Sequence, residues 1–83
     1  MELRRITMNP YDFTLYQDAS GGFVIKVVFS EGDYKMDIER YFVVGSLSDD
    51  SMEALKLLAV QIRDDYPDTP YPEIHRADVT IVR

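Results

Sequence analysis

The sequence predicts an α+β domain in which one amphipathic helix packs on one face of an antiparallel sheet of four or five strands, in the order ββ(β)-α-β. Two observations carry this prediction. Residues 11–44 contain apolar runs with the period of two that is typical of strands, and residues 48–65 contain a single stripe with the period of a helix. With 83 residues and no cysteine, the chain is expected to form one domain, 1–83, held together by apolar burial.

The earliest strands are predicted before the Gly21-Gly22 pair. Residues 11–16 alternate apolar and polar side chains, which favours a strand with one buried face. Residues 3–8 are a further candidate, bent from the next strand at Asn9-Pro10, and account for the choice between four and five strands. Residues 23–29 are apolar on both parities except at Lys26, which is typical of a central strand.

A hairpin is predicted to follow the central strand. Glu31-Gly32-Asp33 provides a short turn, and residues 34–44 form the returning strand. Arg40 interrupts the apolar parity of that strand. We therefore expect either a β-bulge at Arg40 or the end of the buried stretch there.

The helix is predicted over about residues 48–65. Residues 48–51 offer several N-caps, among them Asp50, which stands three residues before Glu53 in capping-box spacing. Pro67 ends the helix, three prolines in residues 66–72 predict a stiff extended connector, and residues 74–82 predict a last strand. The side chains expected to pack on the sheet are Met52, Leu55, Leu58, Ala59, Ile62 and Tyr66.

The sheet face away from the helix carries side chains that suit water poorly. They are Tyr16, Val24, Val28, Tyr41 and Val43. One interpretation is that they are ordinary strand formers scattered in solvent. The other is a face used for contacts, most simply for a homodimer with a second copy of the chain.

The net charge of −6 is concentrated in one part of the chain. Residues 31–73 hold eleven carboxylates against four cations, while the rest of the chain is nearly balanced. Such a one-sided field repels nucleic acid and steers basic partners toward the protein. We therefore expect no direct binding of nucleic acid.

The predicted outer side of the helix combines this acid with two aliphatic residues. Leu57 and Val60 fall in one row with Glu53 and Asp64, beside Asp50. Either the two are simply exposed or covered by a loop, or they form an apolar anchor within a charged rim, as in a protein interface. The predicted partner-binding residues are Asp50, Glu53, Leu57, Val60 and Asp64, joined by Asp33, Asp37 and Glu39 of the hairpin.

Catalytic signals are weak. His75 is the single histidine and shares strand parity with apolar residues, so it is expected to end a buried row and not to act as a base. The doublets Asp49-Asp50 and Asp64-Asp65 lack the ligand spacing of a calcium loop. We expect no enzyme activity, no metal and no cofactor, with a small enzyme using His75 as the third hypothesis.

These observations favour a small acidic protein that binds another protein. The first hypothesis is an inhibitor or immunity-type protein, bacterial or from a phage, whose carboxylates occupy the cationic groove of a nuclease or a CRISPR effector as a nucleic-acid mimic. The second is an assembly subunit that oligomerises through its open sheet face. Since no segment has the length and apolarity of a membrane span or a signal peptide, a cytoplasmic location is expected, without membrane contact.

Overall fold

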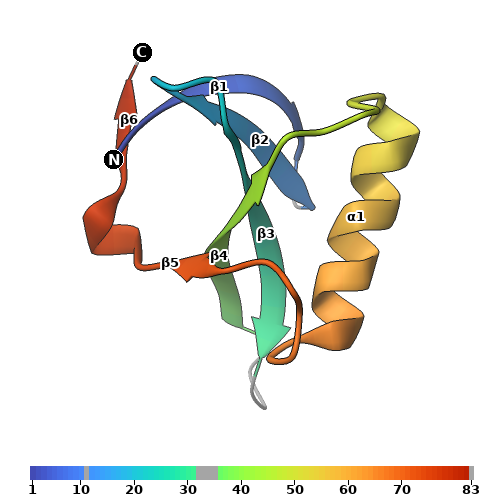
Figure 1. Ribbon diagram of the computed structural model, residues 1–83. Coiled ribbons are helices and arrows are strands. Elements are labelled where there is room, and N and C mark those ends of the chain that lie inside the picture. Colours follow the sequence, from blue (N-terminus) through green and yellow to red (C-terminus); the bar gives the residue numbers. More distant parts are fainter. Residues whose placement is uncertain (11, 32–35, 83) are drawn as a thin grey trace.

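A computed structural model describes residues 1–10, 12–31 and 36–82, and it contains a curled six-stranded mixed sheet with one α-helix in the described chain (Figure 1). The sheet order is β5-β4-β3-β2-β1-β6. The elements are β1 (Glu2–Asn9), β2 (Phe13–Asp18), β3 (Phe23–Glu31), β4 (Met36–Gly45), α1 (Met52–Asp65), β5 (Glu73–Ile74), the 3-10 helix η1 (Arg76–Asp78) and β6 (Thr80–Val82). The α+β class is confirmed, but the sheet has more strands than expected and is not wholly antiparallel, because β6 pairs in parallel with β1.

The curl of the sheet comes from its two bulges and from the C-terminal segment. The register shifts between Arg5 and Thr7 in β1, and between Phe23 and Val24 opposite the end of β4. Bulges bend a strand and increase its twist. The predicted last strand is split by η1, so that β5 pairs with one edge of the sheet and β6 with the other, and one segment joins both edges (Figure 1).

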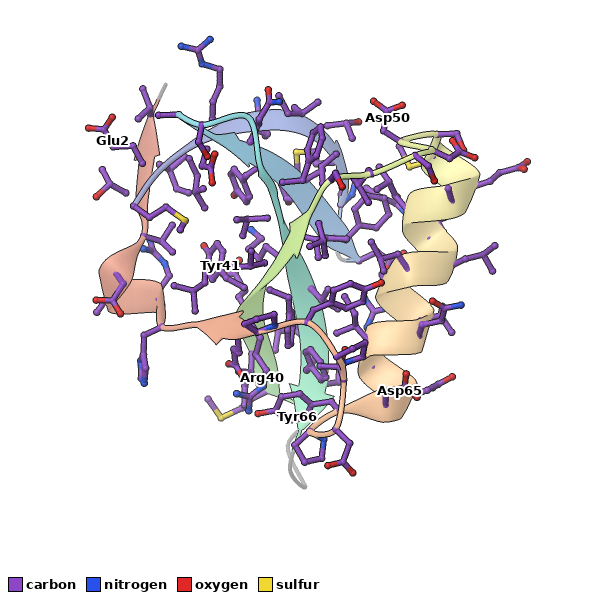
Figure 2. The ribbon with its side chains drawn as sticks, in the orientation of Figure 1. Glu2, Arg40, Tyr41, Asp50, Asp65 and Tyr66 are labelled. Atoms are coloured by element: carbon purple, nitrogen blue, oxygen red, sulfur yellow. The ribbon has the colours of Figure 1, made fainter. Side chains whose placement is uncertain are left out.

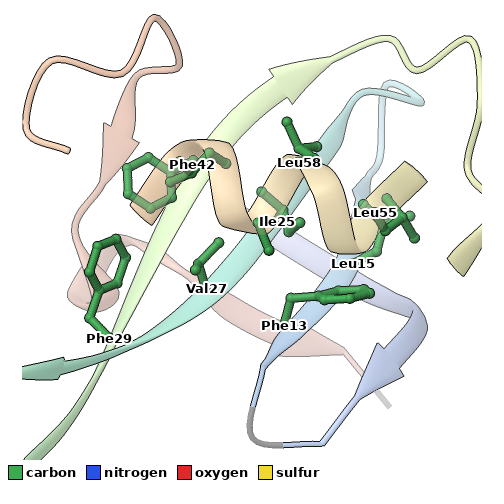
Figure 3. Close-up of a cluster of buried hydrophobic side chains, with 10 residues drawn as sticks. Phe13, Leu15, Ile25, Val27, Phe29, Phe42, Leu55 and Leu58 are labelled. Carbon is green, nitrogen blue, oxygen red and sulfur yellow. The ribbon is translucent and has the colours of Figure 1, made fainter. Parts of the chain in front are cut away.

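The first core lies between α1 and the sheet (Figure 3). Leu55, Leu58, Ala59 and Ile62 are buried there as predicted, whereas Met52 is 39% exposed at the first turn of the helix. The residues of this core are Phe13, Leu15, Ile25, Val27, Phe29, Phe42, Leu55, Leu58, Ala59 and Ile62.

The second core lies on the opposite face of the sheet, within the curl. It consists of Leu3, Tyr16, Val24, Tyr41 and Val79, with Val43, Ile74 and Ile81 packed against it. Burial and the neighbouring Tyr16 phenol raise the pKa of Tyr41. The face that one of the two interpretations assigned to a second copy is therefore covered by the chain's own C-terminal segment. Tyr16, Val24 and Tyr41 are inside the protomer, while Val28 and Val43 are half-buried.

His75 also differs from its expected place. It is exposed and is the residue before η1, so it does not end a buried row. The physical reason is that β5 ends at Ile74, and the 3-10 turn changes the alternation of inward and outward positions before β6 begins.

The helix α1 begins at Met52, four residues later than predicted, and Asp50 of the predicted capping box is not its N-cap. Ser51, one of the four candidate caps, is the N-cap: its hydroxyl accepts a hydrogen bond from the Ala54 N–H at 3.3 Å. Asp49 accepts a hydrogen bond from the Ser51 N–H at 2.9 Å, which lowers the pKa of the Asp49 carboxyl. The helix ends at Asp65, two residues before Pro67.

Arg40 marks the end of the buried stretch of β4 and not a bulge. It pairs in register with Val27, and its guanidinium lies 4.6 Å from the ring centre of Tyr66 while making a 3.2 Å ion pair with Glu73. Residues of the same parity become more exposed toward the start of the strand, from buried Phe42 to Met36. The turn expected at residues 31–33 lies mostly outside the described residues.

Arg63 fastens the last turn of α1 to the sheet. Its Nε donates to the Val28 carbonyl oxygen at 2.8 Å, and its Nη2 donates to the Asp12 carbonyl oxygen at 2.7 Å and to the Asp12 carboxylate. Because the charged guanidinium donates to backbone carbonyl oxygens, these hydrogen bonds are stronger than hydrogen bonds between two neutral groups. The contact joins three elements or their flanks, namely α1, β3 and the start of β2.

We predict that Arg63→Met destabilises the protein by about 2 kcal/mol, since methionine keeps the apolar stem but leaves backbone carbonyls without their charged donor. Urea unfolding followed by circular dichroism measures the change. Lys56→Met, an exposed site on the same helix, is the matched control and should change stability by less than about 0.5 kcal/mol. Equal stability of the two variants would show that the Arg63 contacts do not matter for folding.

Candidate protein-binding surface

The outer side of α1 carries an exposed apolar pair with carboxylates before and after it along the helix, and exposed Lys56 lies beside the pair. We call Asp50, Glu53, Leu57, Val60 and Asp64 the helix surface. Leu57 is 65% exposed and Val60 is 47% exposed, and the three acidic residues are exposed as well. The structure thus brings together the five helix-side residues that the sequence predicted for partner binding.

Helix geometry explains this arrangement. The stripe from Leu55 to Ile62 faces the sheet, so residues about 180° away around the helix must face solvent. Glu53 and Asp64 are eleven positions apart, which corresponds to about 16 Å along the axis. Figure 2 shows side chains projecting outward along the whole of α1, with Asp50 near its start and Asp65 at its end.

The contacts of Arg63 make this surface more acidic than its sequence suggests. Arg63 and Lys56 are the two cations of α1, and the Arg63 guanidinium is drawn toward Val28 and Asp12 of the sheet side. Lys56 remains exposed. Sequence reasoning missed this role of Arg63, although its position directly after buried Ile62 is a signal that it borders the packed stripe.

The hairpin residues are not part of the helix surface. Glu39 makes a 2.6 Å ion pair with Lys26 and shares strand parity with Tyr41, whose side chain is in the second core, away from α1. Asp37 has the same parity and accepts a hydrogen bond from the Ser30 hydroxyl at 3.3 Å. Asp33 lies outside the described residues. Asp37 lines a hollow with Arg63 of α1, but no residue of the helix surface contributes to that hollow, so the predicted set is divided between two regions.

Positive charge is found on a different part of the surface. Arg4 and Arg5 of β1 are exposed and line an open hollow of about 630 Å³ together with Tyr16, Ile81 and Val82. These arginines come from β1, four strands away from β5 in the sheet order, and α1 contributes no residue to the hollow. The protein thus presents acid on its helix and arginine on β1.

Neither a cluster of metal-ligand side chains nor a membrane-spanning helix is found among the described residues. Within the ranges that the structure covers, no three histidine or carboxylate side chains gather as a metal site. No helix in this part of the chain is long and apolar enough to cross a bilayer.

Comparison of the chain with protein-family models, with curated proteins and with solved structures found no match.

Proposed function

We propose that this protein is an acidic binding module that inhibits or neutralises a basic partner protein through the helix surface. The observation that carries the proposal is the exposure of Leu57 and Val60 at the centre of a row that begins and ends with carboxylates. Exposed aliphatic residues alone are ordinary. Their position inside an acidic rim is the pattern of an interface that attracts a basic surface and excludes water at its centre.

The partner that fits best is a nuclease or another nucleic-acid-binding protein. Such proteins hold phosphates in cationic grooves, and a row of carboxylates about 16 Å long can occupy such a groove in their place. A small acidic domain without a cofactor suits this task, as in toxin immunity or in phage inhibition of CRISPR effectors. Arg63 supports the proposal, because its contacts with the sheet turn one cation away from the acidic row.

Two variants should separate the roles of the rim and the anchor. The partner protein is captured from the native host, and its binding to each variant is then measured. Asp64→Lys should lower the association rate constant several-fold and make that rate less dependent on salt, because charges at the edge of an interface steer the encounter. Leu57→Ala should instead speed dissociation about tenfold or more, because a desolvated anchor holds the complex together. The measurement is binding kinetics at two salt concentrations for both variants and the wild type. Unchanged kinetics in both variants would place the interface elsewhere.

A further inference from the structure

The outer edge of β4 has no strand partner at Asp37 and Glu39 among the described residues. β5 pairs with β4 at Tyr41 and Phe42. The chain then leaves β4 at His75, because the same segment must reach β1 at the other edge of the sheet as β6. Figure 1 shows β5 leading away from β4 into η1 and β6, so the earlier part of β4 extends past the end of its neighbour.

The backbone groups of Asp37 and Glu39 point outward along this edge. The Val43 N–H donates to the Pro72 carbonyl oxygen at 2.8 Å, on the β5 side of β4. Backbone groups alternate in direction along a strand, and β4 pairs with β3 without a shift from Met36 to Val43. Residues 41, 39 and 37 therefore direct their N–H and C=O groups to the same side as Val43, where an added strand can bind them.

The two faces of this edge differ in chemistry. The carboxylates of Asp37 and Glu39 are exposed on one face of the sheet, where Glu39 also makes its ion pair with Lys26 of β3. On the other face, Met36 is 68% exposed and Ile38 is half-buried. A residue of β4 and the residue directly opposite it in an added strand have their side chains on the same face of the sheet. This edge therefore selects basic side chains opposite the acids and apolar side chains opposite Ile38 and Met36.

A second copy of the chain does not suit the described edge. In antiparallel pairing, outward-facing residues of one strand are opposite outward-facing residues of the other. Two copies paired with Asp37 opposite Glu39, or with either residue opposite its own equivalent, place acid opposite acid. Like charges directly opposite each other are destabilising, and acidic side chains on an edge commonly prevent self-association.

We infer that the edge of β4 at Asp37 and Glu39 binds an extended segment of another protein, antiparallel to β4, in which basic residues alternate with apolar ones. Binding by strand addition obtains its affinity from main-chain hydrogen bonds and its specificity from alternate side chains. This site is separate from the helix surface and does not rest on the function proposed for it. It gives the hairpin acids a role of their own.

A designed peptide provides the probe. Acetyl-Lys-Val-Lys-Val-Lys-Val-Lys-amide presents lysines opposite the acids and valines opposite the apolar face. The control has the same sequence with backbone N-methyl groups on its lysines, which keeps the charge but removes the N–H groups that would bond to Asp37 and Glu39. We expect the probe to slow amide hydrogen exchange at Asp37 and Glu39 at least tenfold, and the methylated peptide to bind at least tenfold more weakly. Equal binding of both peptides, or unchanged exchange, would overturn the inference.

Variants of the protein test whether the backbone N–H of residue 37 contributes to binding of the probe. Asp37→Pro removes an outward N–H but no bond to β3, whereas Asp37→Asn keeps the N–H and removes only the charge. The probe should bind Asp37→Pro at least tenfold more weakly than wild type and Asp37→Asn only a few-fold more weakly, with thermal unfolding as the check of folding. The probe should bind the Leu57→Ala protein with the same affinity as the wild type. If Leu57→Ala weakened binding of the probe as much as Asp37→Pro, the peptide would lie on the helix surface and the inference would be overturned. If Asp37→Pro does not fold, the methylated peptide decides the matter on wild-type protein.

Discussion

Leu55→Ala is expected to lower the free energy of unfolding by about 2–5 kcal/mol. Leu55 is 1% exposed and belongs to the core between α1 and the sheet, where its removal leaves a cavity that the curled strands cannot readily fill. A domain of this length has about 4–12 kcal/mol of stability in total. The variant should therefore unfold at a much lower urea concentration, or fail to fold at all.

The control for this variant lies two positions further along the same helix. Leu57→Ala makes the same chemical change at an exposed site and should alter stability by less than about 0.5 kcal/mol. Equilibrium urea unfolding of both variants gives the comparison. If the two substitutions had equal effects, the orientation of α1 on the sheet would be wrong.

Val79→Asp is expected to destabilise the protein by about 3 kcal/mol or more. Val79 is 6% exposed and packs with Leu3, Tyr16 and Tyr41, so the substitution places a carboxylate in an apolar environment. The charge is best relieved by release of the C-terminal segment. That release exposes the second core, and we expect the variant to self-associate at micromolar concentration in sedimentation.

Thr80→Asp is the matched control because Thr80 is the next residue and is exposed. It should remain as stable as wild type to within about 0.5 kcal/mol and should not self-associate. Stability of Val79→Asp at the wild-type level would contradict the view that the C-terminal segment closes the curl and covers this core.

Much of the fold could be predicted because it depends on local periodicity. The stripe of α1, its stop before Pro67 and the central position of β3 follow from side-chain spacing and from proline chemistry. The β3–β4 pairing follows from two apolar runs that lie close together in the chain. These signals lie within one element or between neighbours in the chain.

The closure of the sheet could not be predicted in this way. The parallel pairing of Leu3 with Ile81 joins residues from opposite ends of the chain, and no local pattern specifies it. A covered face of Tyr16, Val24 and Tyr41 was one of two interpretations of the sequence, and the sequence did not indicate which segment covers it. The 3-10 turn after His75 is equally hidden, because alternation continues through residues 74–82 as if they formed one strand.

In the candidate site, too, some features follow from local sequence patterns and others depend on tertiary contacts. Four residues of the helix surface, namely Glu53, Leu57, Val60 and Asp64, follow from the 100° step of an α-helix, which a sequence displays directly, whereas Asp50 precedes the N-cap. Whether Asp37 and Glu39 join them depends on the face of β4 to which they belong, and that is fixed by long-range packing of Tyr41 against the C-terminal segment. The contacts of Arg63 with Val28 and Asp12 are likewise tertiary.

The central claim is that the helix surface binds a basic partner protein through an apolar centre. It is tested most directly by comparing what the wild-type protein and the Leu57→Glu/Val60→Glu double variant capture from a lysate of the native host, by quantitative mass spectrometry. Both substitutions are at exposed sites, so the fold is expected to persist, and the variant is more acidic than the wild type. We predict that a basic protein captured by the wild type is lost with the variant, despite the greater negative charge. Capture of the same proteins in the same amounts by both would contradict the claim.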